Sequence, residues 1–127
     1  MSKKIIKTDQ ASLPVGPYNQ AVVTGNLVYT AGQIPLDKAG NMVPGGIKEQ
    51  TEQVFANLIA VLTAAGSSLD NVVKATVFMK DLNDFAGMNE VYGKYIKNET
   101  APARSTLQVA RIPKDSLVEI EVVSYIC

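Results

Sequence analysis

APARSTLQVARIPKDSLVEIEVVSYIC, residues 101–127, is the stretch of sequence that decides the fold. It holds two runs in which apolar and polar residues alternate, over 104–109 and 118–123. Successive side chains of a strand point to opposite faces, so each run predicts a strand with one apolar and one polar face. If both apolar faces pack on one core, Arg104, Glu119 and Glu121 share the opposite face of the sheet. A fixed cation beside carboxylates is the best candidate for chemistry in the sequence.

The residues upstream predict further strands and two helices. Apolar, β-branched runs predict strands over 3–7, 21–24, 27–33 and 72–80, with a tight hairpin at Gly25-Asn26. Apolar residues at spacings of three and four predict a helix over 47–65 and a second one from the N-cap Asp84 to about residue 96. The faces expected to be buried carry Ile47, Thr51, Val54, Phe55, Leu58, Leu62 and Ala65 in the first helix, Phe85, Met88, Tyr92 and Tyr95 in the second, and Val73, Ala75, Val77 and Met79 in the strand over 72–80. Asn57 is expected on the polar side of the first helix.

The order ββ-α-β-α-ββ, with an additional N-terminal edge strand, predicts an α+β fold in which two helices pack on one face of a sheet of about six strands. The other face of that sheet is then uncovered in a monomer. It is expected to carry Leu27, Tyr29, Val72, Phe78, Leu117, Val123 and Tyr125 beside Lys74, Arg104, Glu119 and Glu121. So much apolar surface next to charges predicts oligomerisation through this face, with sites at subunit boundaries.

Composition limits the classes of function. The 127 residues predict a single domain, 1–127, and the formal net charge is zero, which argues against a nucleic acid or an anionic membrane as partner. The absence of histidine excludes Ser-His and Cys-His nucleophile pairs and imidazole metal sites. One cysteine, Cys127, and no signal-like or membrane-spanning apolar run predict a cytoplasmic protein.

Two side chains of the closing strands and one loop tyrosine are candidates for chemistry. The guanidinium of Arg104 matches a carboxylate with two parallel hydrogen bonds, and the alternative is a structural pair with Glu119, Glu121 or an acid of another subunit. Glu119 is a candidate general acid/base, and the alternative is a carboxylate that only neutralises a nearby cation. Tyr18 follows Gly16-Pro17 in a stiff loop, where it closes over a ligand or anchors the packing.

Two further positions are weaker candidates. Ala31-Gly32-Gln33 ends a strand with a glycine, which marks either a close approach of a ligand to the backbone or a bulge. Asn89 lies on the second helix beside its buried stripe, where an asparagine is usually just solvated. No role is expected for the terminal Cys127.

The motifs that hold these candidates resemble those of one family. They read VGPY at 15–18, TAGQIP at 30–35, VKATVF at 73–78, PARS at 102–105, VARIPKD at 109–115 and VEIE at 118–121. In this order they are similar to the reactive-intermediate deaminase family (RidA, also called the YjgF family). The resemblance covers nearly the whole chain, and its most specific part is the closing stretch.

The resemblance implies a chorismate-mutase-like fold with a mixed sheet, assembled as a homotrimer with three clefts between subunits. It implies a hydrolase that converts 2-imino acids, such as 2-iminobutanoate and 2-iminopropanoate, and their enamine tautomers to 2-keto acids and ammonia, without metal or cofactor. Such intermediates are released by pyridoxal-phosphate enzymes of amino-acid metabolism. The family's roles fall on Arg104 for the substrate carboxylate, Glu119 for the water, Tyr18 of the GPY motif, the strand-end Gly32 and the helix residue Asn89.

Two positions depart from the commonest family pattern. Ala31 stands where many members have serine, and Thr106 stands where many have cysteine. Both are expected to contact substrate, Thr106 through its backbone, so the departures bear on substrate range. Two other functions stay open: a 2-keto-acid sensor or regulatory binding protein, and an endoribonuclease or translation inhibitor, which zero net charge and the lack of a basic-aromatic strip disfavour.

Overall fold

The computed structural model describes residues 2–127. Its elements follow one another as β1 (Lys4–Ile6), β2 (Ala21–Thr24), β3 (Leu27–Thr30), α1 (Ile47–Ala65), β4 (Val72–Met79), α2 (Phe85–Tyr95), β5 (Ala103–Gln108) and β6 (Val118–Tyr125). This order confirms the predicted succession of strands and helices, including the N-terminal edge strand.

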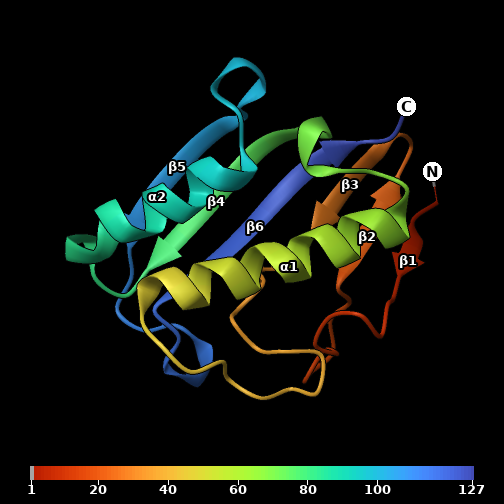
Figure 1. Cartoon of the computed structure of the whole chain (residues 1–127). Coiled ribbons are helices and arrows are strands. Elements are labelled where there is room, and N and C mark those ends of the chain that lie inside the picture. The colour runs from red at the N-terminus through yellow and green to blue at the C-terminus, as the bar shows by residue number, and fades with distance from the viewer. Residues whose placement is uncertain (1) are drawn as a thin grey trace.

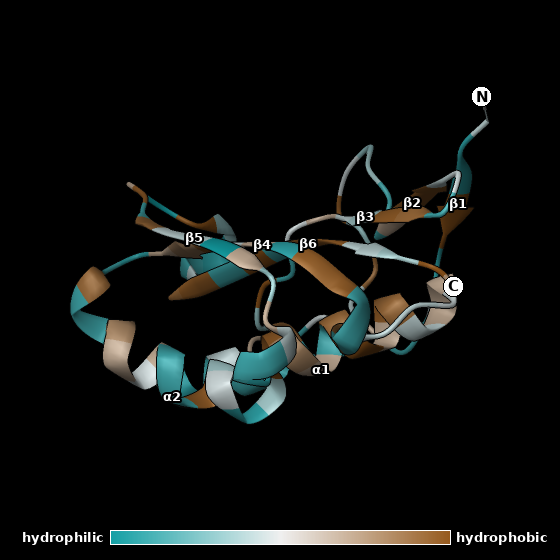
Figure 2. Ribbon diagram, turned by 90° about the horizontal axis from the view of Figure 1, so that it is seen from above, coloured by the Kyte–Doolittle hydropathy of each residue, from teal (hydrophilic) through white to brown (hydrophobic). Residues whose placement is uncertain are grey.

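The strands form one mixed sheet in the order β1-β2-β3-β6-β4-β5. The β4–β5 pair is parallel and the other pairs are antiparallel. The parallel pair requires a crossover, and α2 supplies it. Both helices lie on one face of the sheet, and among the described residues neither α-helix covers the other face (Figures 1 and 2). The predicted α+β class is confirmed, with the closing strand β6 inside the sheet.

Helix α1 supplies the centre of the core. Val54, Phe55, Leu58 and Leu62 are fully buried against the sheet, as the spacing of apolar residues predicts. Gly66 ends the helix in the left-handed conformation (φ 83°) that favours glycine.

For one polar residue of α1, the side of the helix predicted from the sequence is wrong. Asn57, expected on the polar side, is 1% exposed. Its Nδ2 donates to the carbonyl oxygens of Ile34 (3.0 Å) and Leu36 (2.9 Å), and its Oδ1 accepts from Gln53 (2.9 Å). A buried amide is tolerated because its hydrogen bonds are satisfied.

Helix α2 covers the β5 edge of the sheet. Met88 and Tyr92 are buried as expected, but Phe85, expected in the buried stripe, is 37% exposed at the first turn. Asp84 occupies the N-cap position without a side-chain cap. The cap lies earlier, where Asp81 accepts from Asn83 N, because a short 3₁₀ turn, Leu82–Asp84, leads directly into the helix.

A bulge in β4 reverses part of the predicted burial. Val72 pairs with Ser124 and Lys74 pairs with Val123, so Val73 is an extra residue in the ladder. Val72 is therefore buried (4% exposed) and Val73 is exposed (45%), the opposite of what strict alternation predicts. Beyond the bulge Ala75, Val77 and Met79 face the core as expected.

The predicted common face of Arg104, Glu119 and Glu121 is wrong. Arg104 pairs in register with Ala75, a core residue, and so faces the helices. Glu119 and Glu121 pair with Phe78 and Thr76 and so face the open side. The reason is that β5 is an edge strand whose helix side meets α2, whereas its apolar Leu107 (39% exposed) lies on the open side.

Val72, also predicted on the open face, is instead buried in the core because of the bulge, whereas other predicted residues do lie on the open face. Cross-strand pairs place Tyr29, Val123 and Lys74 in one row and Thr76 with Glu121 in the next. Tyr29 is 44% exposed there. Within residues 2–127 no helix has the length and apolar character required to cross a bilayer.

Candidate active site in two halves

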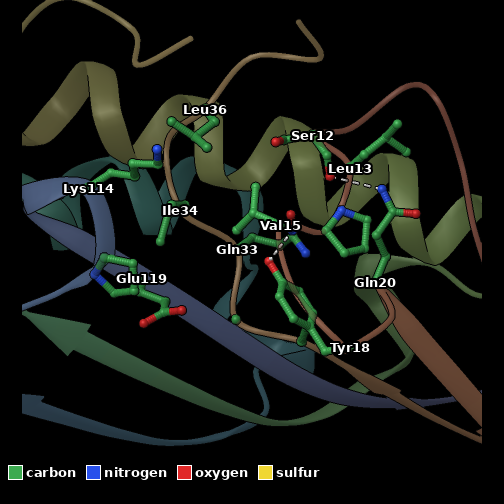
Figure 3. A pocket seen from close by; sticks show the side chains of 14 residues that line it. Ser12, Leu13, Val15, Tyr18, Gln20, Gln33, Ile34, Leu36, Lys114 and Glu119 are labelled. Carbon is green, nitrogen blue, oxygen red and sulfur yellow. Dashed lines mark hydrogen bonds between the residues drawn. The ribbon is translucent and has the colours of Figure 1, made fainter. Parts of the chain in front are cut away.

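A cavity of about 420 Å³ lies where the loop before β2, the segment after β3 and the loop before β6 meet (Figure 3). Its walls combine apolar side chains with one carboxylate, one ammonium and one phenol. It is lined by Ser12, Leu13, Pro14, Val15, Tyr18, Gln20, Ala31, Gly32, Gln33, Ile34, Leu36, Pro113, Lys114 and Glu119. The structure thus brings together four predicted site residues: Tyr18, Ala31, Gly32 and Glu119.

Gly32 is needed because the Glu119 carboxylate lies against its backbone. A Cβ at Gly32 would stand 2.7 Å from Cδ and 2.9 Å from Cγ of Glu119, closer than real Cβ contacts. The chain leaves β3 at Thr30 and rejoins β6 at Gln33, whose N and O bond to Ile120 (2.8 and 3.2 Å). The irregular ladder supports the bulge interpretation, and the group that approaches the Gly32 backbone is the Glu119 side chain; the approach of a ligand stays a prediction.

Glu119 lies in an environment that favours the protonated form of its carboxyl. Burial, and secondly the negative charge of Glu121, raise its pKa. Within residues 2–127 the Glu119 carboxylate has no ion pair and no hydrogen bond, so no cation opposes this shift. The alternative that Glu119 merely neutralises Arg104 or Lys74 in the same chain is wrong.

Tyr18 lies at the mouth of the cavity, 49% exposed. Its hydroxyl accepts a long hydrogen bond from Val15 N (3.4 Å), which closes the loop on itself. The loop is fixed to the core by the buried Gln20, whose Nε2 donates to Thr8 O and Ser12 O (both 3.0 Å). The aromatic side chain is therefore held over the cavity with its ring available to a ligand.

Two more buried amides fix the other walls. Asn57 holds the segment at Ile34 and Leu36 through the hydrogen bonds described above. Gln50 accepts from Leu117 N (2.8 Å), directly before the strand that carries Glu119. Each wall of the cavity is thus tied to the core through an amide side chain.

The second half of the site surrounds Arg104, on the helix side of β5. Its Nη1 donates to Asn89 Oδ1 (2.8 Å), and its guanidinium lies 4.5 Å from the ring centroid of Tyr92 and 5.6 Å from that of Phe85. Such stacking stabilises a cation while leaving its edge open. Within residues 2–127 Arg104 forms no ion pair, so its remaining N–H donors stay available to an anion.

Two hydroxyls beside Arg104 have no partner among the described residues. They belong to Tyr92 and to Thr106, which lies two residues along β5 on the same face. Burial raises the pKa of Tyr92, and the nearby Arg104 cation opposes that shift. A small cavity of about 270 Å³ adjoins this group, lined by Asn89, Tyr92 and Arg104 among others.

The two halves do not meet in one chain. Arg104 is aligned with Val122 across β4, so Glu119 is about 10 Å farther along the strands and about 10 Å across two strand spacings. The two side chains also leave opposite faces of the sheet. Arg104, Asn89 and Thr106 therefore form one group, and Tyr18, Ala31, Gly32 and Glu119 form another.

Several residues of both halves carry no sequence signal of a functional role. The spacing of Tyr92 and Phe85 predicts only core residues, and the sequence does not single out Gln20 or, outside its motif, Lys114. A signal existed for Lys114, because Ile112-Pro113-Lys114-Asp115 is a turn sequence next to the Glu119 strand. For Gln20, Gln50 and Asn57, no sequence signal distinguishes a buried amide that binds backbone groups from a solvated one.

Comparison with known proteins places the chain in a family. The model of the family described as Endoribonuclease L-PSP matches residues 8–126. A RutC family protein of Pyrococcus abyssi is 52% identical, with 98% of each chain covered. The 2-iminobutanoate/2-iminopropanoate deaminase of Bos taurus is 45% identical, over 96% of this chain and 89% of the relative.

A solved structure of a similar protein has the same fold as this chain. The crystal structure of E. coli TdcF with bound serine superimposes with a TM-score of 0.91 at 42% identity, over 98% of this chain and 99% of the other. The fold, the family model and these identities over nearly whole chains point the same way, and the chain belongs to the RidA/YjgF family, whose model carries the description Endoribonuclease L-PSP.

Proposed function

We propose that the chain is a 2-iminobutanoate/2-iminopropanoate deaminase, a hydrolase of C=N bonds that yields 2-keto acids and ammonia. The observation that carries this is the Glu119 carboxylate, half-buried against Gly32 in a cavity, with its pKa raised by burial. The name of the bovine relative supplies the reaction. Arg104, Glu119 and Tyr18 are the proposed catalytic residues, and Gly32, Ala31, Asn89 and Thr106 contribute to substrate binding.

The proposal requires an assembly, because a small imino acid cannot bridge Arg104 and Glu119 of the same chain. The open face of the sheet, with Tyr29, Phe78 and Val123 beside Lys74 and Glu121, is suited to burial against a second copy. We propose a homotrimer in which the Arg104 group of one subunit faces the Glu119 cavity of the next. A cytoplasmic location, where pyridoxal-phosphate enzymes release such imines, is part of the same proposal.

In the proposed reaction the substrate carboxylate docks on the Arg104 guanidinium, which Asn89 and the two rings hold in place. Charge-assisted bonds of this kind contribute roughly 1.5–3 kcal/mol each. The imine carbon then lies near a water that Glu119 orients. Tyr18 covers the cavity and excludes bulk solvent.

The proton balance of the reaction needs only Glu119 and water. Glu119 takes a proton from the water as its oxygen bonds to the C=N carbon and passes that proton to the imine nitrogen, which gives a neutral carbinolamine and restores the carboxylate. Glu119 then takes the hydroxyl proton and delivers it to the nitrogen, the C–N bond breaks, and ammonia leaves as the hydroxyl oxygen becomes the keto group. Acid/base help of about 10² to 10⁴ is sufficient for a spontaneously hydrolysing substrate.

A second candidate function is 2-keto-acid or amino-acid sensing without turnover. The serine bound in the TdcF structure favours it, because that ligand has the carboxylate that Arg104 would bind. Endoribonuclease activity rests on the family description, and it requires a basic surface that a chain of zero net charge does not favour.

The test is a coupled assay in which an amino acid oxidase generates the 2-imino acid and keto-acid release is followed. Wild type is expected to accelerate release, and Arg104→Ala and Glu119→Gln are expected to abolish the acceleration. Arg104→Lys should lose most of it, because the two-pronged fork is lost. No acceleration by wild type, together with tight 2-keto-acid binding, would favour the sensor.

Mixing the two inactive variants tests whether the site is shared between subunits. If Arg104→Ala and Glu119→Gln chains are unfolded together and refolded at equal amounts, about one quarter of the interfaces regain both intact halves. The mixture should therefore recover up to about a quarter of wild-type turnover, whereas the variants refolded separately should stay inactive. An inactive mixture of correctly assembled protein would contradict the shared site.

A further inference from the structure

The turn before β6 has an unusual backbone. Lys114 (φ 60°) and Asp115 (φ 55°) are both left-handed, and Ser116 N closes the turn on Pro113 O (3.3 Å). Two central residues with positive φ are the pattern that Asn and Gly normally fill. A lysine at this position is a poor choice for the backbone, so its side chain is the feature to be explained.

The surroundings hold the turn in this shape. Arg111 Nε and Nη2 donate to the two carboxylate oxygens of Asp115 (2.8 and 3.2 Å). Ile112 is buried (2% exposed), and Ser116 Oγ donates to Pro113 O (2.8 Å). Both ends of the turn are thus fixed, which fixes the place from which Lys114 extends.

Lys114 extends along the wall of the Glu119 cavity. Figure 3 shows its ammonium and the Glu119 carboxylate toward one side of the cavity and the Tyr18 ring toward the other. Among the described residues it is the one cation that lines this cavity. Although Asp115 is its neighbour in sequence, that carboxylate is taken by Arg111, and within residues 2–127 no acid lies within 4.0 Å of the Lys114 ammonium.

The cavity is also larger than the smallest substrates need. Its volume of about 420 Å³ falls in the range of sites for much larger ligands. If Arg104 of a neighbouring subunit holds the α-carboxylate and Glu119 faces the reacting carbon, the rest of the substrate extends into this space. There it meets aliphatic walls from Leu13, Val15 and Ile34, and one uncompensated positive charge.

We propose that Lys114 is a specificity-determining residue that binds a second anionic group on the substrate. The chain would then act on dicarboxylic 2-imino acids, the class formed by oxidation of aspartate and glutamate, as well as on short monocarboxylic ones. This inference rests on the proposed deaminase function.

The test compares 2-iminopropanoate with 2-iminosuccinate and 2-iminoglutarate, each generated in the assay by an amino acid oxidase. Lys114→Asn is the informative variant, because asparagine accepts the left-handed backbone without the charge. It should lower kcat/KM for the dicarboxylic imines about tenfold or more and leave that for 2-iminopropanoate within about twofold. Lys114→Arg, which keeps the charge, should retain the dicarboxylic activity.

Binding separates this inference from the proposed function. Calorimetry with 2-oxoglutarate and 2-oxobutanoate should show that Lys114→Asn weakens only the dicarboxylate. An equal effect on both ligands, or none on either, overturns the role of Lys114 whether or not turnover occurs. Absence of turnover in wild type with all three imines overturns the deaminase proposal, and the selective loss of 2-oxoglutarate binding would still support the role of Lys114.

Discussion

Replacing Gly32 by alanine should inactivate the protein without unfolding it. The added Cβ would stand 2.7 Å from Cδ and 2.9 Å from Cγ of Glu119, so the carboxylate has to move by about 1 Å to reach ordinary contact distance. A displacement of that size in a catalytic group costs about 10² in rate. Gly32 does not have a positive φ, so alanine imposes no backbone strain there and reduces the freedom of the unfolded chain.

We therefore expect kcat for 2-iminopropanoate hydrolysis to fall about 100-fold in Gly32→Ala, while the free energy of unfolding stays within about 1 kcal/mol of wild type. Gly46→Ala is the matched control, because its Cβ would meet only Glu49 Oε1, at 3.9 Å, away from the cavity. That variant should keep wild-type turnover. If Gly32→Ala retained full turnover with wild-type stability, the argument that Glu119 must occupy this place would be refuted.

Three other substitutions follow from the same geometry. Because burial and Glu121 raise the pKa of Glu119, the folded chain binds that proton more tightly than the unfolded chain does, so Glu119→Gln should stabilise the fold at pH 7. Urea titrations should show this gain shrinking as pH falls through the folded pKa and vanishing below about pH 4. Tyr92→Phe removes a hydroxyl without a partner in the described chain and should change the free energy of unfolding by less than about 1 kcal/mol. A loss of more than about 2 kcal/mol would contradict the absence of a hydrogen-bond partner. Asn57→Leu should lower the free energy of unfolding, measured by chemical denaturation, by about 2 kcal/mol or more, because the Ile34 and Leu36 carbonyls lose their donor. An unchanged denaturation midpoint would contradict a stabilising role for these two hydrogen bonds.

Helix α1 and the β2–β3 hairpin could be predicted closely because their signals are local. The helix spans Ile47–Ala65, the range that the apolar spacing predicts, and it ends at Gly66 as that residue suggests. The hairpin turns at Gly25-Asn26 between paired strands. In both cases the residues that determine the element are its own, so no distant contact could override them.

The face of Arg104 could not be predicted, because it depends on what lies across the sheet. Alternation in residues 104–109 defines two faces but does not say which one meets the helices. At an edge strand the apolar Leu107 can face the open side while Arg104 is sandwiched against Tyr92. The bulge at Val73 could not be predicted from alternation either, because a single extra residue moves Val73 outward and Val72 inward.

The assignment of Arg104 to the helix side alters how the site has to work. Had both charges shared a face, they would have been free to pair, and the Arg104 cation would lower the pKa of Glu119. On opposite faces each keeps its own environment: Arg104 retains unused donors over aromatic rings, and Glu119 keeps a pKa that burial raises. The proposed imine hydrolysis uses both a cation ready for a carboxylate and a carboxyl ready for a proton. In the proposed homotrimer, the two groups stay separate within each chain and would meet only between subunits, so both properties would persist until a substrate carboxylate neutralises the cation.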